Sequence, residues 1–303
     1  MARVSGIAES LDGRLKATVR ATGLDIHALA GRTLVEGILR HWHHGLGPAA
    51  IELKGGLLFD QTVRPTSDAD LTVARQYLPH ELARGMLVIR GLLQAEGMDV
   101  DFLSETPQVI DIGHGDPVNQ WKLGGKVGGV KTRTQLDLSL ARGPDAVSRY
   151  GTVRDIPSLI PRLPTLRIRC QPLEAAAAEK LLAVLCQPDT DMRVKHLSDV
   201  LDERLWEGVD CGQIARELQR VCRHRGIDPT ELPVTLDVSD YERLRENWTK
   251  HFRPSAPPLS FDKAIADAAY LWSEVQDCMT PMLRPSLAPV AHEQPARVRG
   301  MSR

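Results

Sequence analysis

The sequence predicts an α+β protein, with an N-terminal α/β lobe built on a mixed sheet and an α-helical lobe after it. Two features of the apolar pattern support this prediction. Helical and strand-like segments alternate up to about residue 170, and from Pro172 onward apolar residues recur mostly at helical spacing. We therefore expect an N-terminal extension over 1–24, a first lobe over 25–170, a helical lobe over 171–284 and a disordered tail over 285–303.

In the first lobe, apolar spacing predicts a helix over 25–44, and Pro79 and Gly97 bracket a second helix. Strand-like segments are expected at 49–53, after the glycines that end the first helix, and at 69–73, after a polar loop that contains Pro65. The clearest alternation lies at 135–140, within the β-rich segment 98–170. In the second lobe we expect helices over 172–186, 192–206, 211–225, 239–251 and 261–283.

The composition is that of a globular protein and excludes several function classes. Apolar residues make up 42% and charged residues 25% of the 303 residues. The 38 basic and 39 acidic residues nearly cancel, which excludes a protein that coats nucleic acid through its overall charge. No apolar run resembles a secretory signal or reaches membrane-spanning length, and the five cysteines show no C-x-x-C spacing. We expect a cytoplasmic protein without membrane contact.

The strongest chemical signal is a pair of aspartates shortly after a glycine turn. Lys54-Gly55-Gly56 is followed, after a gap of eleven residues, by Asp68-Ala-Asp70. Side chains two apart on a strand share a face, so Asp68 and Asp70 should point together into a cleft. Two carboxylates so close disfavour each other's ionisation unless positive charge lies between them, and Mg²⁺ or Mn²⁺ suits such oxygen donors. The pair therefore predicts a divalent metal site.

The two glycines and a third aspartate complete a predicted triphosphate site. Without a Cβ, Gly55 and Gly56 allow backbone N–H groups to approach a phosphate. Asp137, in a strand-like Leu-Asp-Leu, could share the metal or take a proton from an attacking hydroxyl. The alternatives are an Asp-x-Asp on a surface loop and a solvated aspartate at a strand end.

Four segments, taken in order, resemble the AbiEii/AbiGii toxin family, which belongs to the DNA polymerase β-like nucleotidyltransferases. The similarity covers about residues 30–205. The segments are Leu53-Lys-Gly-Gly56, Arg64-Pro-Thr-Ser-Asp-Ala-Asp-Leu71, Leu173-Glu-Ala-Ala-Ala-Ala-Glu-Lys-Leu181 and Arg193-Val-Lys-His-Leu-Ser-Asp199. The chain departs from the family at His196, where an acid is usual, and at Thr66, where serine is frequent.

The resemblance implies the toxin of a toxin–antitoxin or phage-defence pair, whose cognate antitoxin is often a winged-helix protein encoded beside it. Related toxins, including the mycobacterial MenT group, transfer a nucleotide from an NTP to the 3′ end of tRNA and so stop translation. The resemblance thus implies an Mg²⁺-dependent transferase that acts on tRNA or another RNA. It further implies that Asp68 and Asp70 bind the metal, that Lys180 contacts the triphosphate and that Asp199 completes the active site.

These arguments give two sets of expected site residues. The catalytic set is Asp68, Asp70, Asp137, Lys180 and Asp199. The nucleotide-binding set is Lys54, Gly55, Gly56, Arg64, Thr66, Ser67, Lys180, Arg193 and Lys195. A lysine on an amphipathic helix surface is the alternative for Lys180, and an ordinary i,i+4 pair is the alternative for Lys195 and Asp199.

Two basic segments have no assigned role. Residues 124–132 are rich in Gly and Lys but fail the P-loop register, so a Gly-rich hairpin leading to the Asp137 strand is expected. Its basic residues could meet RNA phosphates or simply be solvated: Lys122, Lys126, Lys131 and Arg133. The same two interpretations apply to a stripe on a later helix: Arg216, Arg220, Arg223, His224 and Arg225.

The sequence thus favours an enzyme that holds an NTP between two lobes and transfers its nucleoside monophosphate to RNA. One alternative keeps the NTP site but changes the acceptor to a protein or a small molecule. Another is a catalytically idle module that binds an NTP or the antitoxin.

Overall fold

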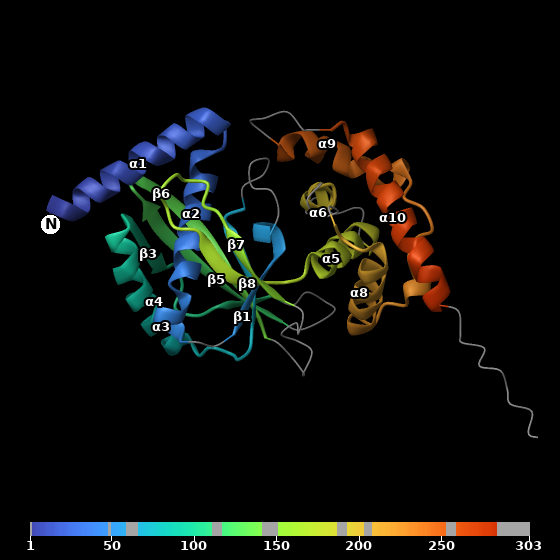
Figure 1. Cartoon of the computed structure of the whole chain (residues 1–303), viewed down its shortest axis with the longest axis horizontal. Coiled ribbons are helices and arrows are strands. Elements are labelled where there is room, and N and C mark those ends of the chain that lie inside the picture. Colours follow the sequence, from blue (N-terminus) through green and yellow to red (C-terminus); the bar gives the residue numbers. More distant parts are fainter. Residues whose placement is uncertain are drawn as a thin grey trace, which may run out of the picture.

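A mixed β-sheet forms the centre of the N-terminal half of the protein (Figure 1). The computed structural model describes residues 2–47, 50–58, 66–110, 117–140, 151–186, 193–202, 208–252 and 259–283. Within them the sheet has eight strands: β1 Ile51–Lys54, β2 Asp68–Val73, β3 Met98–Phe102, β4 Gln108–Ile110, β5 Val118–Val127, β6 Val130–Leu140, β7 Thr152–Ile156 and β8 Leu166–Cys170.

The strand order is β3-β5-β6-β2-β1-β8-β7, and β4 also pairs with β5. The pairs β2–β6 and β1–β8 are parallel, whereas the other pairs are antiparallel. The expected mixed sheet is therefore confirmed. Its centre consists of β6, β2 and β1, so the segments that carry Asp137, the aspartate pair and Lys54 are neighbours in space.

Helices α1 Ala2–Thr22, α2 Ile26–Arg40, α3 Trp42–Leu46 and α4 Pro79–Ala95 lie together on one side of the sheet (Figure 1). Helix α2 begins where the Asp25 side chain accepts hydrogen bonds from the N–H groups of His27 and Ala28. Every residue from 29 to 39 is buried. Because α2 is enclosed so fully, it fixes the face of β5 and β6 against which it packs.

The C-terminal half is helical and lies on the other side of the sheet (Figure 1). It contains the helices α5 Leu173–Cys186, α6 Arg193–Val200, α8 Cys211–His224, α9 Glu242–His251 and α10 Phe261–Leu283 and the short 3-10 helices η2 Pro229–Glu231 and η3 Val238–Tyr241. A further 3-10 helix, η1 Gly55–Leu58, follows β1 in the N-terminal half. Buried aromatic side chains anchor it: the Tyr241 hydroxyl donates to the Val184 carbonyl at 3.1 Å, and Trp272 Nε1 donates to the Pro233 carbonyl at 2.8 Å.

Most of the expected elements are observed, with three differences. The helix expected over 25–44 is interrupted at His41, which separates α2 from α3. The helix expected over 192–206 ends at Val200 in the described part. Residues 2–22 form α1, which the prediction of a mere extension missed because only a thin stripe including Leu11 and Leu15 is buried.

The division into two domains at residue 170 stays a prediction, because buried residues of both halves form one continuous apolar core. The tail expected over 285–303 lies outside the described residues. Among the described helices, none is both long and apolar enough to cross a membrane.

Candidate active site

Four polar residues form a row across the centre of the sheet. In the β1–β2 ladder, Lys54 lies opposite Asp70. In the β2–β6 and β5–β6 ladders, Asp137 lies beside Asp70 and opposite Gln120. Directly paired residues point to the same face of a sheet, and Asp68, two residues before Asp70, shares that face. Strand pairing therefore gathers three carboxylates and one ammonium group on one surface.

The opposite face of the same strands belongs to the core. Ala69 and Leu71 are 0% and 1% exposed, as the alternation predicts, and Leu136 and Leu138 of β6 are buried beside them. A shift of register by one residue would bury the aspartates instead, so the apolar face holds the carboxylates in place.

The glycine turn packs directly against the aspartate pair. Gly55 has φ +70°, and a Cβ there would overlap the Oδ2 atom of Asp70. A Cβ at Gly56 would lie 2.6 Å from the Thr66 hydroxyl oxygen. These glycines were expected to open space for a phosphate. The structure gives them another role, because they make room for the Asp70 carboxylate and for Thr66, and the phosphate role stays a prediction.

The Asp137 carboxylate is under electrostatic strain. Burial and the nearby negative charges of Asp70 and Asp68 raise its pKa to about 6, although hydrogen bonds from Gln120 and Gln135 act in the opposite direction. Gln135 Nε2 donates to Asp137 Oδ2 at 3.1 Å. The other oxygen, Oδ1, is buried and accepts no hydrogen bond from the residues that the structure describes. A carboxylate with this pKa is mostly ionised at neutral pH and is able to take a proton.

On the helical side, Lys180 and Asp199 form a largely buried ion pair. Lys180 lies on α5 and Asp199 on α6, with 3.2 Å between Nζ and Oδ2, and their side chains are 12% and 5% exposed. Lys180 Nζ is also 3.4 Å from Nδ1 of His196. The two residues that the family resemblance places in the active site are therefore in contact. His196, which replaces the usual acid, adjoins the same ammonium group.

Glu179 and Gln171 connect this helical pair to the sheet. Burial disfavours the charge of Glu179, but Lys54, Arg225, a hydrogen bond from Gln171 and Lys180 outweigh it and lower its pKa. Gln171 Nε2 donates to Glu179 at 3.0 Å, and the Gln171 N–H donates to the Leu53 carbonyl at 2.9 Å. The start of α5 is thus held beside Lys54 at the end of β1.

The donor set fits a hard divalent cation. Asp68 and Asp70 offer oxygen ligands on one face, and beside them lies the buried Oδ1 atom of half-buried Asp137, which has no hydrogen-bond partner among the described residues. Across the described parts of the chain, no three His, Cys, Asp or Glu side chains already converge as metal ligands. The fit therefore rests on the chemistry of the carboxylates and on their mutual repulsion, which a cation would relieve.

Of the remaining predicted residues, one contacts the aspartate pair, two lie on α6 and one is not described. Ser67 precedes the pair, and its hydroxyl lies 3.3 Å from Asp68 Oδ1. Lys195 is half-buried on α6, and Arg193 begins that helix, although its side chain is not described. Arg64 lies outside the described residues.

Sequence reasoning assigned no role to four polar residues of this region. Gln120 and Gln135 act on Asp137, Glu179 interacts with Lys54, and Glu52 is a buried carboxylate two residues before Lys54. Burial raises the pKa of Glu52, against the attraction of Lys54, Arg169 and Arg220. The one available signal was Glu179, because a charge inside an Ala- and Leu-rich helix lies close to apolar surface and needs a partner there.

Comparison with known proteins adds a family. The model of the family described as "Nucleotidyl transferase AbiEii toxin, Type IV TA system" matches residues 38–267. No curated protein matches the chain. Two solved structures from Helicobacter pylori are similar to this chain. One is a candidate nucleotidyltransferase, with 14% sequence identity and a TM-score of 0.47; the match covers 86% of this chain and 99% of that one. The other is JHP933, with 15% identity and a TM-score of 0.48; the match covers 86% of this chain and 96% of that one. Both TM-scores lie below 0.5, so no conclusion about this chain is drawn from the two structures.

Replacement of the strained carboxylate should stabilise the fold. In buffer with a chelator at pH 7.5, Asp137→Asn should raise the free energy of unfolding by about 1–2 kcal/mol, because the raised pKa means that the charge destabilises the folded state. The gain should shrink as the pH falls from about 6 towards 4, where the wild-type carboxyl is itself protonated when folded. Urea unfolding measures it, with exposed Asp155→Asn as control. A destabilised variant, or a gain independent of pH, would contradict the assignment.

Replacement of the turn glycine should displace Asp70. Gly55→Ala adds a Cβ both at positive φ and onto the Asp70 carboxylate, whereas Gly23→Ala adds one at φ +74° with nothing within 4 Å. The control should lose about 1 kcal/mol of unfolding free energy, the cost of a left-handed residue. Gly55→Ala should lose more and should also lower nucleotidyl transfer at least roughly tenfold, because the reacting groups are misplaced. Equal losses in both variants would mean that the turn does not position Asp70.

Proposed function

We propose, on the premise that this chain belongs to the AbiEii family of nucleotidyl transferase toxins, that it transfers a nucleoside monophosphate from an NTP to an RNA. The favoured acceptor is the 3′ end of tRNA. The consequence would be a block of translation. The observation that carries the proposal is the shared row of Lys54, Asp70 and Asp137 with Asp68 beside it.

The three carboxylates would bind the metal and accept the proton at the reacting phosphate. Asp68 and Asp70 would hold Mg²⁺ or Mn²⁺, which would neutralise charge that develops on the phosphates. Asp137, with a pKa of about 6, is suited to accept the proton of the attacking hydroxyl. Its position next to Asp70 places that base within the same group of side chains.

The cations would hold the triphosphate. An ammonium group has three donors, so Lys180 can keep its contact with Asp199 and still donate to a phosphate. Asp199 would act as a positioning residue that fixes Lys180. Lys54 borders the carboxylate row from the other edge and is itself drawn towards Glu179. The nucleotide would therefore lie between the sheet and α5.

The family membership also bears on partners. A type IV toxin–antitoxin family implies an antitoxin partner and an NTP substrate. The tRNA acceptor and a role in phage defence rest on the resemblance to tRNA-modifying toxins. A protein or small-molecule acceptor would use the same NTP site, so the acceptor has to be identified by experiment.

Transfer should depend on Asp70 and should label RNA. With radiolabelled NTPs and separate pools of tRNA, other RNA, protein and small molecules, we expect label at tRNA 3′ ends. Asp70→Ala should lower the rate at least roughly a hundredfold because a main charge-stabilising group is lost. Asp155→Ala, an exposed strand carboxylate, is the matched control and should transfer normally.

Two results would overturn the proposal. Label found only in protein or small molecules would exclude an RNA acceptor. Unchanged transfer by a folded Asp70→Ala variant would remove the carboxylate row from catalysis. Expression with and without the cognate antitoxin, followed by sequencing of tRNA 3′ ends, extends the same test to cells.

A further inference from the structure

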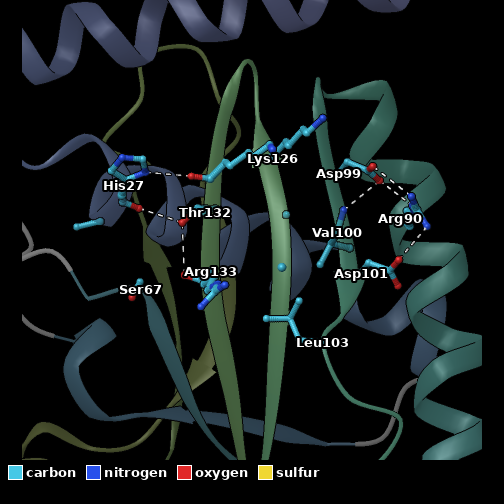
Figure 2. A pocket seen from close by; sticks show the side chains of 14 residues that line it. His27, Ser67, Arg90, Asp99, Val100, Asp101, Leu103, Lys126, Thr132 and Arg133 are labelled. Carbon is cyan, nitrogen blue, oxygen red and sulfur yellow. Dashed lines mark hydrogen bonds and ion pairs between the residues drawn. The ribbon is translucent and has the colours of Figure 1, made fainter.

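A groove of about 810 Å³ lies on the sheet beside the carboxylate row (Figure 2). Strands β3, β5 and β6 and the first turn of α2 line it. Ser67, which precedes Asp68, is the one residue that the groove shares with the predicted nucleotide-binding set, and none of the three site carboxylates lines it. The groove is therefore a separate surface that adjoins the candidate active site.

The floor of this groove continues the catalytic face of the sheet. Along β6 the side chains of Asp137, Gln135, Arg133 and Lys131 alternate onto one face, whereas Thr132 and its even-numbered neighbours are buried under α2. At about 3.3 Å per residue, Arg133 lies about 13 Å and Lys131 about 20 Å from Asp137 along the strand. Basic side chains thus extend outward from the predicted point of attack.

The charges of the groove are not explained by the stability of the fold. Lys131 lies directly opposite Lys126 in the β5–β6 ladder, and like charges in that arrangement destabilise a sheet. Within the described part of the chain, Lys126, Lys131 and Arg133 form no ion pair. Two acidic side chains also line the groove, and one of them, Asp99, lies opposite Lys126 in the β3–β5 ladder. Arg90 already pairs with both, at 2.7 Å from Asp99 and 3.8 Å from Asp101, so the three cations still exceed the negative charge that faces them.

The basic stripe on α8 differs in this respect. Arg220 pairs with Glu217 at 2.7 Å and Arg216 with Asp210 at 3.5 Å. Those charges are partly neutralised within the protein. The groove, by contrast, presents a local excess of positive charge in a chain whose net charge is −1.

The basic hairpin is also held rigidly. His27 Nδ1 lies 3.0 Å from the Lys131 carbonyl oxygen, and the Thr132 hydroxyl donates to the His27 carbonyl at 3.1 Å (Figure 2). At the turn, the Gly128 N–H donates to the Gly97 carbonyl at 3.0 Å. Because the backbone of the hairpin is fixed in this way, only the cationic side chains lose entropy when they bind a ligand.

We propose that this groove binds the sugar–phosphate backbone of the acceptor RNA, with Lys126, Lys131 and Arg133 on successive phosphates upstream of the reacting 3′ end. The inference rests on the proposed function for the direction of the strand. Arg133 and Lys131 are alternate residues of β6 and follow the strand away from Asp137, and Lys126 lies beside Lys131 on β5. Cations that follow one direction in this way suit a linear polyanion, and the excess positive charge favours a nucleic acid over a neutral partner. Leu103, exposed above the Gly124 floor, offers an apolar contact to a base or ribose.

The test compares two triple variants. Lys126→Gln/Lys131→Gln/Arg133→Gln removes the groove cations, and Arg20→Gln/Arg84→Gln/Lys250→Gln removes three exposed cations from helices elsewhere. Fluorescence anisotropy with a labelled single-stranded RNA and with bulk tRNA, in chelator and without NTP, gives Kd at several salt concentrations. The groove variant should bind at least about tenfold more weakly, and its salt slope should fall by about 2 because three phosphate contacts are lost. The control should stay within about twofold of wild type.

Calorimetric NTP binding and thermal unfolding of each variant serve as checks on the site and the fold. NTP binding should be unchanged, and the groove variant should unfold at the wild-type temperature or slightly above it, because the repulsion between Lys126 and Lys131 is removed. Equal RNA affinity of the two triple variants, or no RNA binding by the wild type, would overturn the inference. If RNA binds through the groove but never receives a nucleotide, the proposed function fails while the groove assignment stands. If RNA is a substrate and the groove variant keeps the wild-type KM for it, the groove assignment fails alone.

Discussion

The structure depends on a register of strands that brings negative charges together. Because β2 pairs with β6 in parallel, Asp70 and Asp137 are direct neighbours, and burial with this repulsion raises the pKa of Asp137 to about 6. The apolar face beneath, with Ala69 and Leu71, does not allow the register to slip. Such an arrangement works against stability, and strain of this kind is typical of functional sites.

The rest of the site offsets this concentration of negative charge. Lys54 closes one end of the row, Gln120 and Gln135 donate hydrogen bonds to Asp137, and the Gly55 turn fits against Asp70. The helical half supplies Lys180, held by Asp199. In the proposed site, the sheet would provide ligands for a cation and the helices would provide a cation for phosphate.

The sequence predicted most of the helices and strands, because each has a clear apolar period and recognisable ends. It also predicted that Asp68 and Asp70 share a face, since that follows from two-residue spacing alone. It also suggested that the Asp137 strand runs beside the strand of the aspartate pair, which the β2–β6 pairing confirms. It did not reveal that Lys54 lies opposite Asp70, because strand partners are set by long-range packing. Nor did it reveal that Gly55 makes room for a carboxylate, or that Glu179 interacts with Lys54 from another element. Helix α1 was missed because its buried stripe is thin.

The most direct test of the central claim is a crystal structure with an unreactive NTP analogue and Mn²⁺, whose anomalous scattering locates the metal. The account predicts a metal peak between the carboxylates of Asp68 and Asp70, with the triphosphate extending towards Lys180. A nucleotide bound elsewhere, or two aspartates that splay apart and leave the metal without protein ligands, would contradict it.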